Sequence, residues 1–328
     1  MIFAQGEASP KGWSGMSSRG KFCVAALAVA IVAASGTAWA ASFIPVVTGL
    51  ANPTGVATDA SGNLFIADFG GHAVYESLAP GYGTKTVLAG GPFGSPFGIA
   101  VDRHGNVFVT DDSDESVKEI PAPGYTTVIT LASGFTGLNG LAVDANDNIF
   151  VVDSAATKIF ELKASNYANK VVIGNVAAPF GVAVDAAANV FVTVDTNQSA
   201  NILEFFAATG YQGVTIYGQP VADPQGIAVD AQGNLFFSSV GGGVFKAANV
   251  GGSLVVTGVA GGFQDPLGVA LDSQGNIFVA GGSAGVIDEI GGTPLPVPAL
   301  APGGLALLSL LLGGAGWWAL RGRRTRLS

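Results

Sequence analysis

One stretch of this 328-residue chain, residues 95–111 (SPFGIAVDRHGNVFVTD), recurs in near-copies along most of the sequence. One glycine is shared by all copies and marks their period, with neighbouring copies 41 to 45 residues apart. This glycine is found at Gly55, Gly98, Gly140, Gly181, Gly226 and Gly268. The chain must therefore fold into a structure that repeats one small motif six times.

The length and composition of the repeat favour one architecture. A period in the forties, built from short apolar runs, is typical of a β-propeller in which each blade has four strands. In the second copy, alternation and turn residues place strands at residues 98–101, 106–110, 117–120 and 127–130. We therefore predict an all-β, six-bladed β-propeller over residues 41–291.

The last copy lacks a fourth strand of its own. After its third strand, residues 286–290, the chain reaches Gly291 and a proline-rich segment. Residues 43–48 precede the first inner strand and have the apolar, β-branched character of an outermost strand, where Pro45 is tolerated because an edge needs no further donor. We expect both ends of the propeller to share one blade, which closes the ring and removes an open sheet edge.

Charge and cysteine content limit the partners of the folded part. The formal net charge is -9, and both ends of the chain are basic, so the middle is more acidic than the whole. An acidic surface repels phosphate backbones, which argues against nucleic-acid binding and leaves cationic partners open. The one cysteine, Cys23, lies in the N-terminal apolar segment, so we expect a mature propeller without disulfides. We also expect the propeller to be monomeric.

The N-terminal segment has the pattern of an export signal. Two basic residues precede the apolar run 22–34, and a small-x-small sequence typical of a cleavage site ends at Ala40. We predict a signal peptide over residues 1–40. Met16 is an alternative start, because it would bring the basic residues to the front.

The C-terminal segment has the pattern of a linker followed by a membrane anchor. Residues 292–302 are rich in proline, and residues 303–320 are uncharged and strongly apolar. A helix of that length covers about 27 Å, enough for a thin bilayer, and the arginine-rich residues 321–328 would be cytoplasmic. We predict a transmembrane helix at 303–320, with an exported propeller that is anchored to the inner membrane or released to the cell surface or medium.

The internal pattern of the blades carries a family resemblance. In the first blade, Ala67-Asp68 ends an apolar strand and is followed by Gly71-His72-Ala73-Val74. This arrangement resembles the NHL family of propellers, whose blades read Pro-x-Gly-Ile/Val-Ala-Val-Asp, a Gly-Asn turn, an apolar strand ending in Asp, and Asn-His-Arg-Ile/Val. His72 matches the histidine for which the NHL family is named, and the later blades lack that histidine. The fourth blade has Ala188 in place of the turn glycine. The resemblance covers residues 43–290.

The NHL resemblance implies a class of function. Members of that family serve as interaction or ligand-binding modules, while a minority of related propellers are lyases or lactonases. We therefore predict an exported envelope or cell-surface binding module for a protein, peptide or glycan. The alternative is a propeller lyase or lactonase with a carboxylate-rich channel site that could use Ca²⁺.

The tail resembles a second known type of sequence. Bacterial carboxy-terminal sorting tags of the IPTL/PEP-CTERM class combine a short proline-containing motif, one apolar helix and an arginine-rich end. Here Val297-Pro298-Ala299-Leu300 is similar to the Ile-Pro-Thr-Leu form of that motif. The resemblance implies recognition by a processing peptidase, and a plain C-terminal anchor is the alternative.

Four carboxylates recur just after the second strand of the first four blades. They are Asp68, Asp111, Asp153 and Asp195. Because equivalent positions of neighbouring blades meet at the same end of a propeller, these side chains would ring one mouth of the channel. They are our candidate ligand-binding residues. The alternative role is to cap a turn by accepting backbone N–H bonds, for which Asp is well suited. We expect no cofactor, and the ligand of such a ring would be Ca²⁺ or another cationic molecule.

Histidine and tyrosine complete the candidate residues. The repeat register places His72 and His104 at opposite ends of their blades, so we do not expect them to share a metal. A tyrosine recurs at the turn before the fourth strand of four blades, where packing between blades is the expected role. These tyrosines are Tyr82, Tyr125, Tyr167 and Tyr211.

Overall fold

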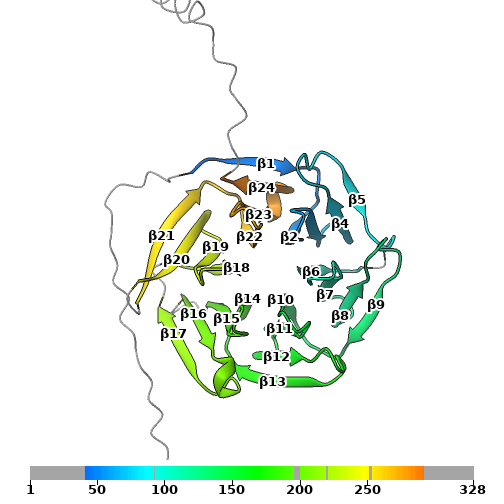
Figure 1. The fold of residues 1–328 in the computed structure, drawn as a ribbon. Coiled ribbons are helices and arrows are strands. Elements are labelled where there is room, and N and C mark those ends of the chain that lie inside the picture. The colour runs from blue at the N-terminus through cyan, green and yellow to red at the C-terminus, as the bar shows by residue number, and fades with distance from the viewer. Residues whose placement is uncertain (1–40, 92, 196–199, 219–220, 251–252, 292–328) are drawn as a thin grey trace, which may run out of the picture. The chain divides into compact units, whose positions relative to one another are not determined.

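The computed structural model describes residues 41–91, 93–195, 200–218, 221–250 and 253–291. In this part of the chain, 24 strands form six four-stranded antiparallel sheets around a central channel (Figure 1). The predicted six-bladed β-propeller is confirmed.

The expected signal peptide, linker, transmembrane helix and sorting motif lie outside the described residues. Within the described ranges, no helix has the length and apolar character needed to cross a bilayer.

Each blade runs from an inner strand at the channel to an outer strand at the rim. Blade 1 has β2(Pro53–Thr58), β3(Leu64–Asp68), β4(Ala73–Ser77) and β5(Lys85–Val87). Blade 2 has β6(Pro96–Val101), β7(Val107–Asp111), β8(Ser116–Ile120) and β9(Ile129–Ala132). Blade 3 has β10(Leu138–Val143), β11(Ile149–Asp153), β12(Lys158–Leu162) and β13(Lys170–Asn175).

The second half of the chain builds three further blades. Blade 4 has β14(Pro179–Val184), β15(Val190–Asp195), β16(Ala200–Phe205) and β17(Val214–Gly218); blade 5 has β18(Pro224–Val229), β19(Leu235–Ser239), β20(Gly243–Val250) and β21(Ser253–Gly261); blade 6 has β22(Pro266–Leu271), β23(Ile277–Gly281), β24(Val286–Ile290) and β1(Phe43–Val47). Two single 3₁₀ turns, η1(Ala207–Thr209) and η2(Gly282–Ala284), lie in loops.

The ring closes through a strand borrowed from the other end of the propeller. Strand β1 pairs antiparallel with β24, placing Phe43 opposite Ile290 and Pro45 opposite Asp288 (Figure 1). The shared blade predicted from the sequence is therefore present. Proline is compatible with this position because β1 is the outer edge of its sheet, where no further ladder bond is required.

The recurring glycine lets the inner strands approach one another at the channel. A Cβ built on Gly226 would lie 2.3 Å from the carbonyl oxygen of Leu267, and one on Gly181 would lie 2.4 Å from that of Gln225. Real Cβ atoms do not approach an oxygen so closely, so only glycine fits at this step of the repeat. The periodicity of the sequence thus reflects a steric requirement of the channel.

Aromatic contacts join successive blades. The rings of Tyr82 and Phe278 lie 5.6 Å apart, edge to face, across the junction of blades 1 and 6. Three more tyrosines repeat this contact on the preceding blade, at centroid distances between 5.6 and 6.3 Å, as Tyr125 with Phe65, Tyr167 with Phe108 and Tyr211 with Phe150. The role in packing between blades that we expected for the tyrosines is confirmed.

Side-chain hydroxyls add polar bonds between neighbouring blades, close to the channel. In each case a threonine or serine of one blade donates to an inner-strand carbonyl of the next blade. These bonds run from Thr54 to Phe97 (2.9 Å), Thr110 to Asn139 (2.7 Å), Thr193 to Gln225 (2.5 Å) and Ser238 to Leu267. They are buried or partly buried, where an unmade hydrogen bond is costly, and so they fix the register of one blade on the next.

The shared blade generates a stability prediction. Deleting Phe43–Val47 removes the partner of β24 and exposes the edge of blade 6, so we expect a truncated propeller that unfolds at lower denaturant concentration and aggregates. Urea denaturation and limited proteolysis would measure the effect. A truncated protein as protease-resistant as the intact chain would contradict the role assigned to β1.

Candidate functional site

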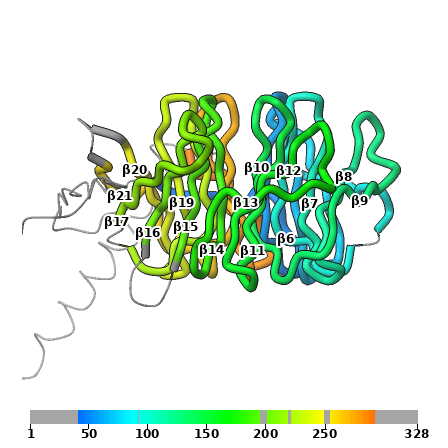
Figure 2. The backbone as a smooth tube through the Cα atoms, turned by 90° about the horizontal axis from the view of Figure 1, so that it is seen from below, coloured from blue at the N-terminus to red at the C-terminus, as the bar shows by residue number. Residues whose placement is uncertain are grey.

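The two ends of the channel are built from different parts of the repeat. We call one end of the propeller the capping face. At this end the second strand of each blade finishes, and the link from the preceding blade enters the inner strand. The turn face is the opposite end, where first and second strands are joined by hairpins. Figure 2 shows the blades edge-on, with loops at both ends.

The turn face is built by an Asp–Asn pair that recurs in all six blades. In blade 1, Asp59 accepts bonds from the backbone N–H (2.9 Å) and the side-chain amide (2.8 Å) of Asn63. The same pair of bonds joins Asp102 to Asn106, Asp144 to Asn148, Asp185 to Asn189, Asp230 to Asn234 and Asp272 to Asn276. These carboxylates are engaged in holding hairpins.

The candidate carboxylates of blades 1 and 3 lie on the capping face and are almost fully buried. Asp68 accepts backbone N–H bonds from Ala51 (2.9 Å) and Asn52 (2.7 Å), in the link that leads into β2. Asp153 accepts bonds from the backbone N–H and hydroxyl of Thr136, both at 2.9 Å. Both carboxylates therefore have the geometry of turn caps, and their role as ligand-binding residues stays a prediction.

Asp111, the equivalent residue of blade 2, has an additional cationic partner. It accepts backbone N–H bonds from Gly94 and Ser95, and it forms an ion pair of 2.7 Å with the ammonium group of Lys118. Burial raises the pKa of Asp111, but the hydrogen bonds from Lys118, Ser113 and the backbone outweigh it and lower the pKa to about 2. The side chain of Asp195, the fourth candidate, is outside the described part.

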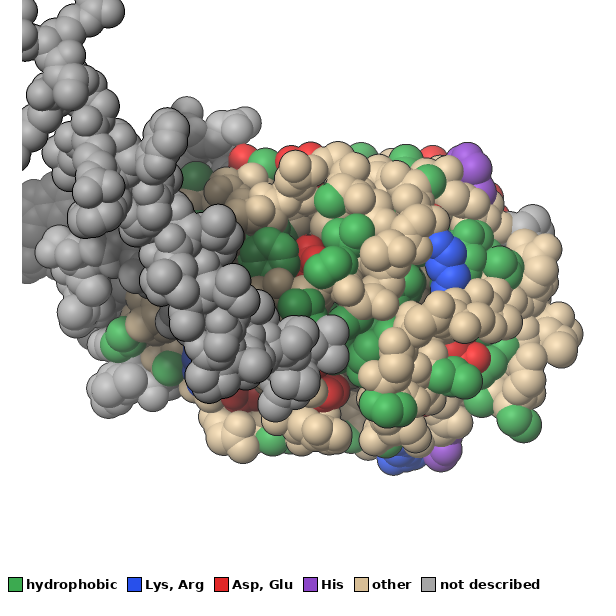
Figure 3. All heavy atoms as spheres, turned by 90° about the horizontal axis from the view of Figure 1, so that it is seen from above, with side chains coloured by type: hydrophobic (Ala, Val, Ile, Leu, Met, Phe, Trp, Pro, Cys, Tyr) green, Lys and Arg blue, Asp and Glu red, His purple; other side chains and the backbone are tan. Residues whose placement is uncertain are grey.

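A metal site would need several of the candidate side chains close together. Among the described residues, no group of three His, Cys, Asp or Glu side chains is close enough to hold a metal ion. His72 contacts the carbonyl of Gly94 on the capping face, whereas the backbone N–H of His104 donates to Asp102 on the turn face. In Figure 3 the histidine colour accordingly appears at two opposite ends of the propeller. The expected separation of the two histidines is confirmed.

The mouth of the channel on the capping face is surrounded by residues that sequence reasoning did not single out. In each blade, the residue just before the recurring glycine lies at the start of the inner strand. These residues are Thr54, Phe97, Asn139, Phe180, Gln225 and Leu267. The signal available in the sequence was the residue before each recurring glycine, within Pro-x-Gly in five blades and Leu-Asn-Gly in the third. Because this residue differs between blades, a search for repeats does not draw attention to it.

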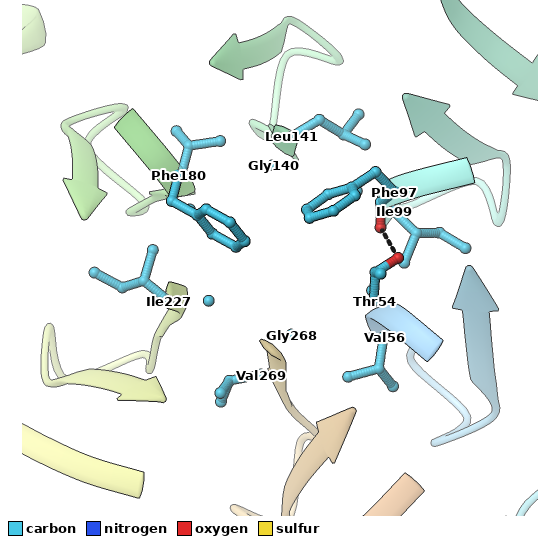
Figure 4. Close-up of a pocket in the computed structure, with 15 residues that line it drawn as sticks. Thr54, Val56, Phe97, Ile99, Gly140, Leu141, Phe180, Ile227, Gly268 and Val269 are labelled. Atoms are coloured by element: carbon cyan, nitrogen blue, oxygen red, sulfur yellow. Dashed lines mark hydrogen bonds between the residues drawn. The ribbon is translucent and has the colours of Figure 1, made fainter. Parts of the chain in front are cut away.

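Two aromatic rings meet across this mouth. Phe97 and Phe180 come from blades 2 and 4, and their ring centroids lie 5.4 Å apart in an edge-to-face arrangement (Figure 4). Phe69 extends the group, at 6.2 Å from Phe97. Both residues, Phe97 and Phe180, are half-buried.

Beside these rings lies a cavity of about 80 Å³. Its wall consists of the recurring glycines and of aliphatic side chains, including Val56, Ile99 and Ile227. Thr54 adds a hydroxyl, which is already bonded to the carbonyl of Phe97 (Figure 4). The site as a whole can accept a compact apolar group.

The Asp111–Lys118 pair generates a pH prediction. The pKa of Asp111 falls from 3.8 to about 2 on folding, so its contribution to stability is present above about pH 4 and is lost as the pH falls through 2. We expect this group to account for up to about 2 kcal/mol of the decrease in unfolding free energy between pH 5 and pH 2. That part of the decrease should be absent in Asp111→Asn, measured by urea denaturation across this range. The exposed Glu115→Gln variant is the control and should keep the wild-type slope, and equal slopes in all three proteins would refute the assignment.

Comparison with known proteins bears on the fold. No protein-family model matches the sequence, and no curated protein sequence matches it. Many solved structures do match, among them a gluconolactonase of Xanthomonas campestris at 18% identity (76% of this chain, 89% of that chain, TM-score 0.65). Others are virginiamycin B lyase of Staphylococcus aureus (11% identity, 76% and 98% covered, TM-score 0.57) and a nidogen/laminin complex (19% identity, 66% and 84% covered, TM-score 0.58). At these identities the likeness shows that the chain shares the six-bladed propeller fold.

Proposed function

We propose that the propeller binds a small organic ligand at the mouth of its channel on the capping face. The observation that carries this proposal is the pair of half-buried rings, Phe97 and Phe180, which meet across the mouth (Figure 4). Exposed aromatic surface at a concave site is the usual anchor of a ligand, because covering it removes apolar area from water.

The surroundings of the two rings indicate the kind of ligand. The cavity wall is aliphatic, and it is formed by backbone atoms wherever a recurring glycine faces the channel. At the neighbouring mouth positions, Asn139 is half-buried and carries an amide, whereas Thr54 and Gln225 are buried. A compact ligand with one apolar face and a few hydrogen-bonding groups fits this combination better than a polyanion, which the acidic protein would repel.

A lactonase or lyase is the second candidate, and the solved structures favour it over a module that only binds. Two of the three structures named above are enzymes, a gluconolactonase and a virginiamycin B lyase. A ligand held at the mouth would lie on the same face as Asp68, Asp111 and Asp153. For one of these carboxylates to act as a general base or to hold Ca²⁺, it would have to release part of its backbone N–H bonds, so catalysis would require a rearrangement of a link between blades.

Export and membrane attachment complete the proposal. The apolar run 22–34 and the small-x-small sequence ending at Ala40 support an N-terminal signal, and residues 303–320 support an anchor. The motif Val297–Leu300 supports removal of that anchor by a processing peptidase. The ligand would then be met outside the inner membrane, where the mouth is open to the envelope or the medium.

The aromatic mouth can be tested with indole as a probe. We expect saturation-transfer NMR to detect binding to the wild-type protein, and the Kd to rise roughly tenfold in Phe97→Ala, because loss of an aromatic contact costs about 1.4 kcal/mol. The control is Phe206→Ala, which removes a half-buried ring from the outer part of blade 4. Indole binding that is equal in all three proteins would exclude the mouth as the ligand site.

Turnover separates the two candidate functions. Hydrolysis of glucono-1,5-lactone, followed in a pH-stat with and without Ca²⁺, should not exceed the spontaneous rate if the protein only binds its ligand. An enzyme-dependent rate that disappears in Asp153→Asn, with the variant still folded, would place the lactonase candidate first.

Processing can be followed by tryptophan fluorescence. All four tryptophans, Trp13, Trp39, Trp317 and Trp318, lie in the two end segments, and the propeller has none. If the signal is removed after Ala40 and the tail is also released, the product should emit only as tyrosine. Tryptophan emission from the exported protein would show that the C-terminal segment is retained.

A further inference from the structure

A second cavity lies at the rim of the capping face, in blade 2, away from the channel. Its volume is about 460 Å³, within the range of small-molecule sites. Three separate parts of the chain line it: the link before β6, the loop after β7, and strands β8 and β9. The lining side chains are Phe93, Ser113, Asp114, Lys118, Val128 and Thr130.

Lys118 makes this cavity unlike the equivalent place in other blades. It occupies the middle of the third strand, where the other blades carry Tyr75, Phe160, Leu203, Phe245 and Asp288. Its side chain is only 6% exposed, and its ammonium group lies 5.4 Å from the centre of the Phe93 ring. Burying a lysine is costly, so its presence in one blade alone calls for a reason.

Capping of the link does not supply that reason. Asp68 and Asp153 hold the links of blades 1 and 3 through backbone N–H bonds and, for Asp153, a threonine hydroxyl. Asp111 receives the same kind of bonds from Gly94 and Ser95. The turn in blade 2 would therefore be formed without a lysine.

The two carboxylates that neutralise Lys118 differ in how they are held. Each has an oxygen 2.7 Å from the ammonium nitrogen. Asp111 is fully buried and fixed by the backbone, whereas the Asp114 side chain is 53% exposed and lies at the opening of the cavity. Asp111 and Lys118 form a neutral pair, which leaves Asp114 as a surface counter-ion. The Asp114 end of this ion pair faces solvent, and Asp114 also accepts a hydrogen bond of 2.5 Å from the Ser116 hydroxyl. Because an exposed carboxylate gains little from such contacts, the carboxyl group of a ligand can replace it at Lys118.

We propose that the rim cavity binds a small apolar carboxylate, whose carboxyl group replaces Asp114 at Lys118. The apolar part of such a ligand would lie along Phe93 and Val128, and the Thr130 hydroxyl would stand beside it. This site is separate from the channel mouth, and it does not depend on the function proposed for the mouth.

Blade 5 offers an internal comparison. A cavity of about 470 Å³ lies at the equivalent place there, lined by Val221, Asp223, Ser239 and Phe245. Its size matches that of the rim cavity, but Phe245 stands where blade 2 has Lys118, and Asp223 adds a negative charge. The shape of the repeat therefore provides the cavity, and Lys118 provides the cation to which the carboxyl group of the ligand would bind.

Phenylacetate is the probe, with neutral phenylacetamide as its matched control. We expect NMR titration of the intact protein to show phenylacetate binding with shifts centred on Phe93 and Thr130, weaker at high salt, and no binding of phenylacetamide at the same concentration. In Asp114→Asn the competing carboxylate is gone, so affinity for phenylacetate should rise roughly threefold to fivefold. Phe97→Ala, at the channel mouth, should leave this binding unchanged, which separates the two proposals.

The complementary experiment removes the ammonium group of Lys118. Lys118→Met combined with Asp111→Asn takes away both members of the buried pair, so that no uncompensated charge remains, and it should abolish phenylacetate binding. Should the double variant fail to fold, Asp114→Asn and phenylacetamide still decide the question. Unchanged affinity in Asp114→Asn, equal binding of the amide, or shifts centred on Phe97 would each overturn the proposal.

Discussion

The close approach of six inner strands is the constraint on which the rest of this structure depends. Each recurring glycine faces a carbonyl oxygen of the next blade, and an added Cβ would lie as near as 2.3 Å to it. Because no side chain fits at that step, the wall there is formed by backbone. The residue before each glycine, such as Phe97 or Phe180, stands at the mouth instead. The packing that closes the ring thus also determines which side chains a ligand would meet.

The acidic character of the chain gives a poor guide to function, because many of its carboxylates are used by the fold. On the turn face, Asp59 and its five equivalents hold hairpins through asparagine. On the capping face, Asp68 and Asp153 hold links between blades. A carboxylate engaged by two or three donors has few lone pairs left for a ligand. A charged side chain indicates a function where the fold does not need it, as in the case of Lys118.

The sequence predicted the architecture well, because periodicity reports backbone geometry. The six blades, the shared strand and the tyrosine contacts between blades all follow from patterns repeated along the chain. The candidate site was harder to predict, since an Asp that caps a turn and an Asp that binds a ligand look alike in sequence. The mouth residues escaped notice because they do not repeat. The rim cavity could not be foreseen at all, because segments as far apart as Phe93 and Thr130 form it only after folding.

Positions that carry the same residue in every blade therefore have a different role from positions at which the blades differ. The turn face carries the same Asp–Asn pair in all six blades, as a purely structural element requires. The capping face differs from blade to blade both at the mouth, where Phe97 and Phe180 stand among polar residues, and at the rim, where Lys118 occupies a position that is aromatic, aliphatic or, in blade 6, acidic. A repeated scaffold binds an asymmetric ligand only where its repeats differ. Recognition by this propeller is therefore expected on the capping face.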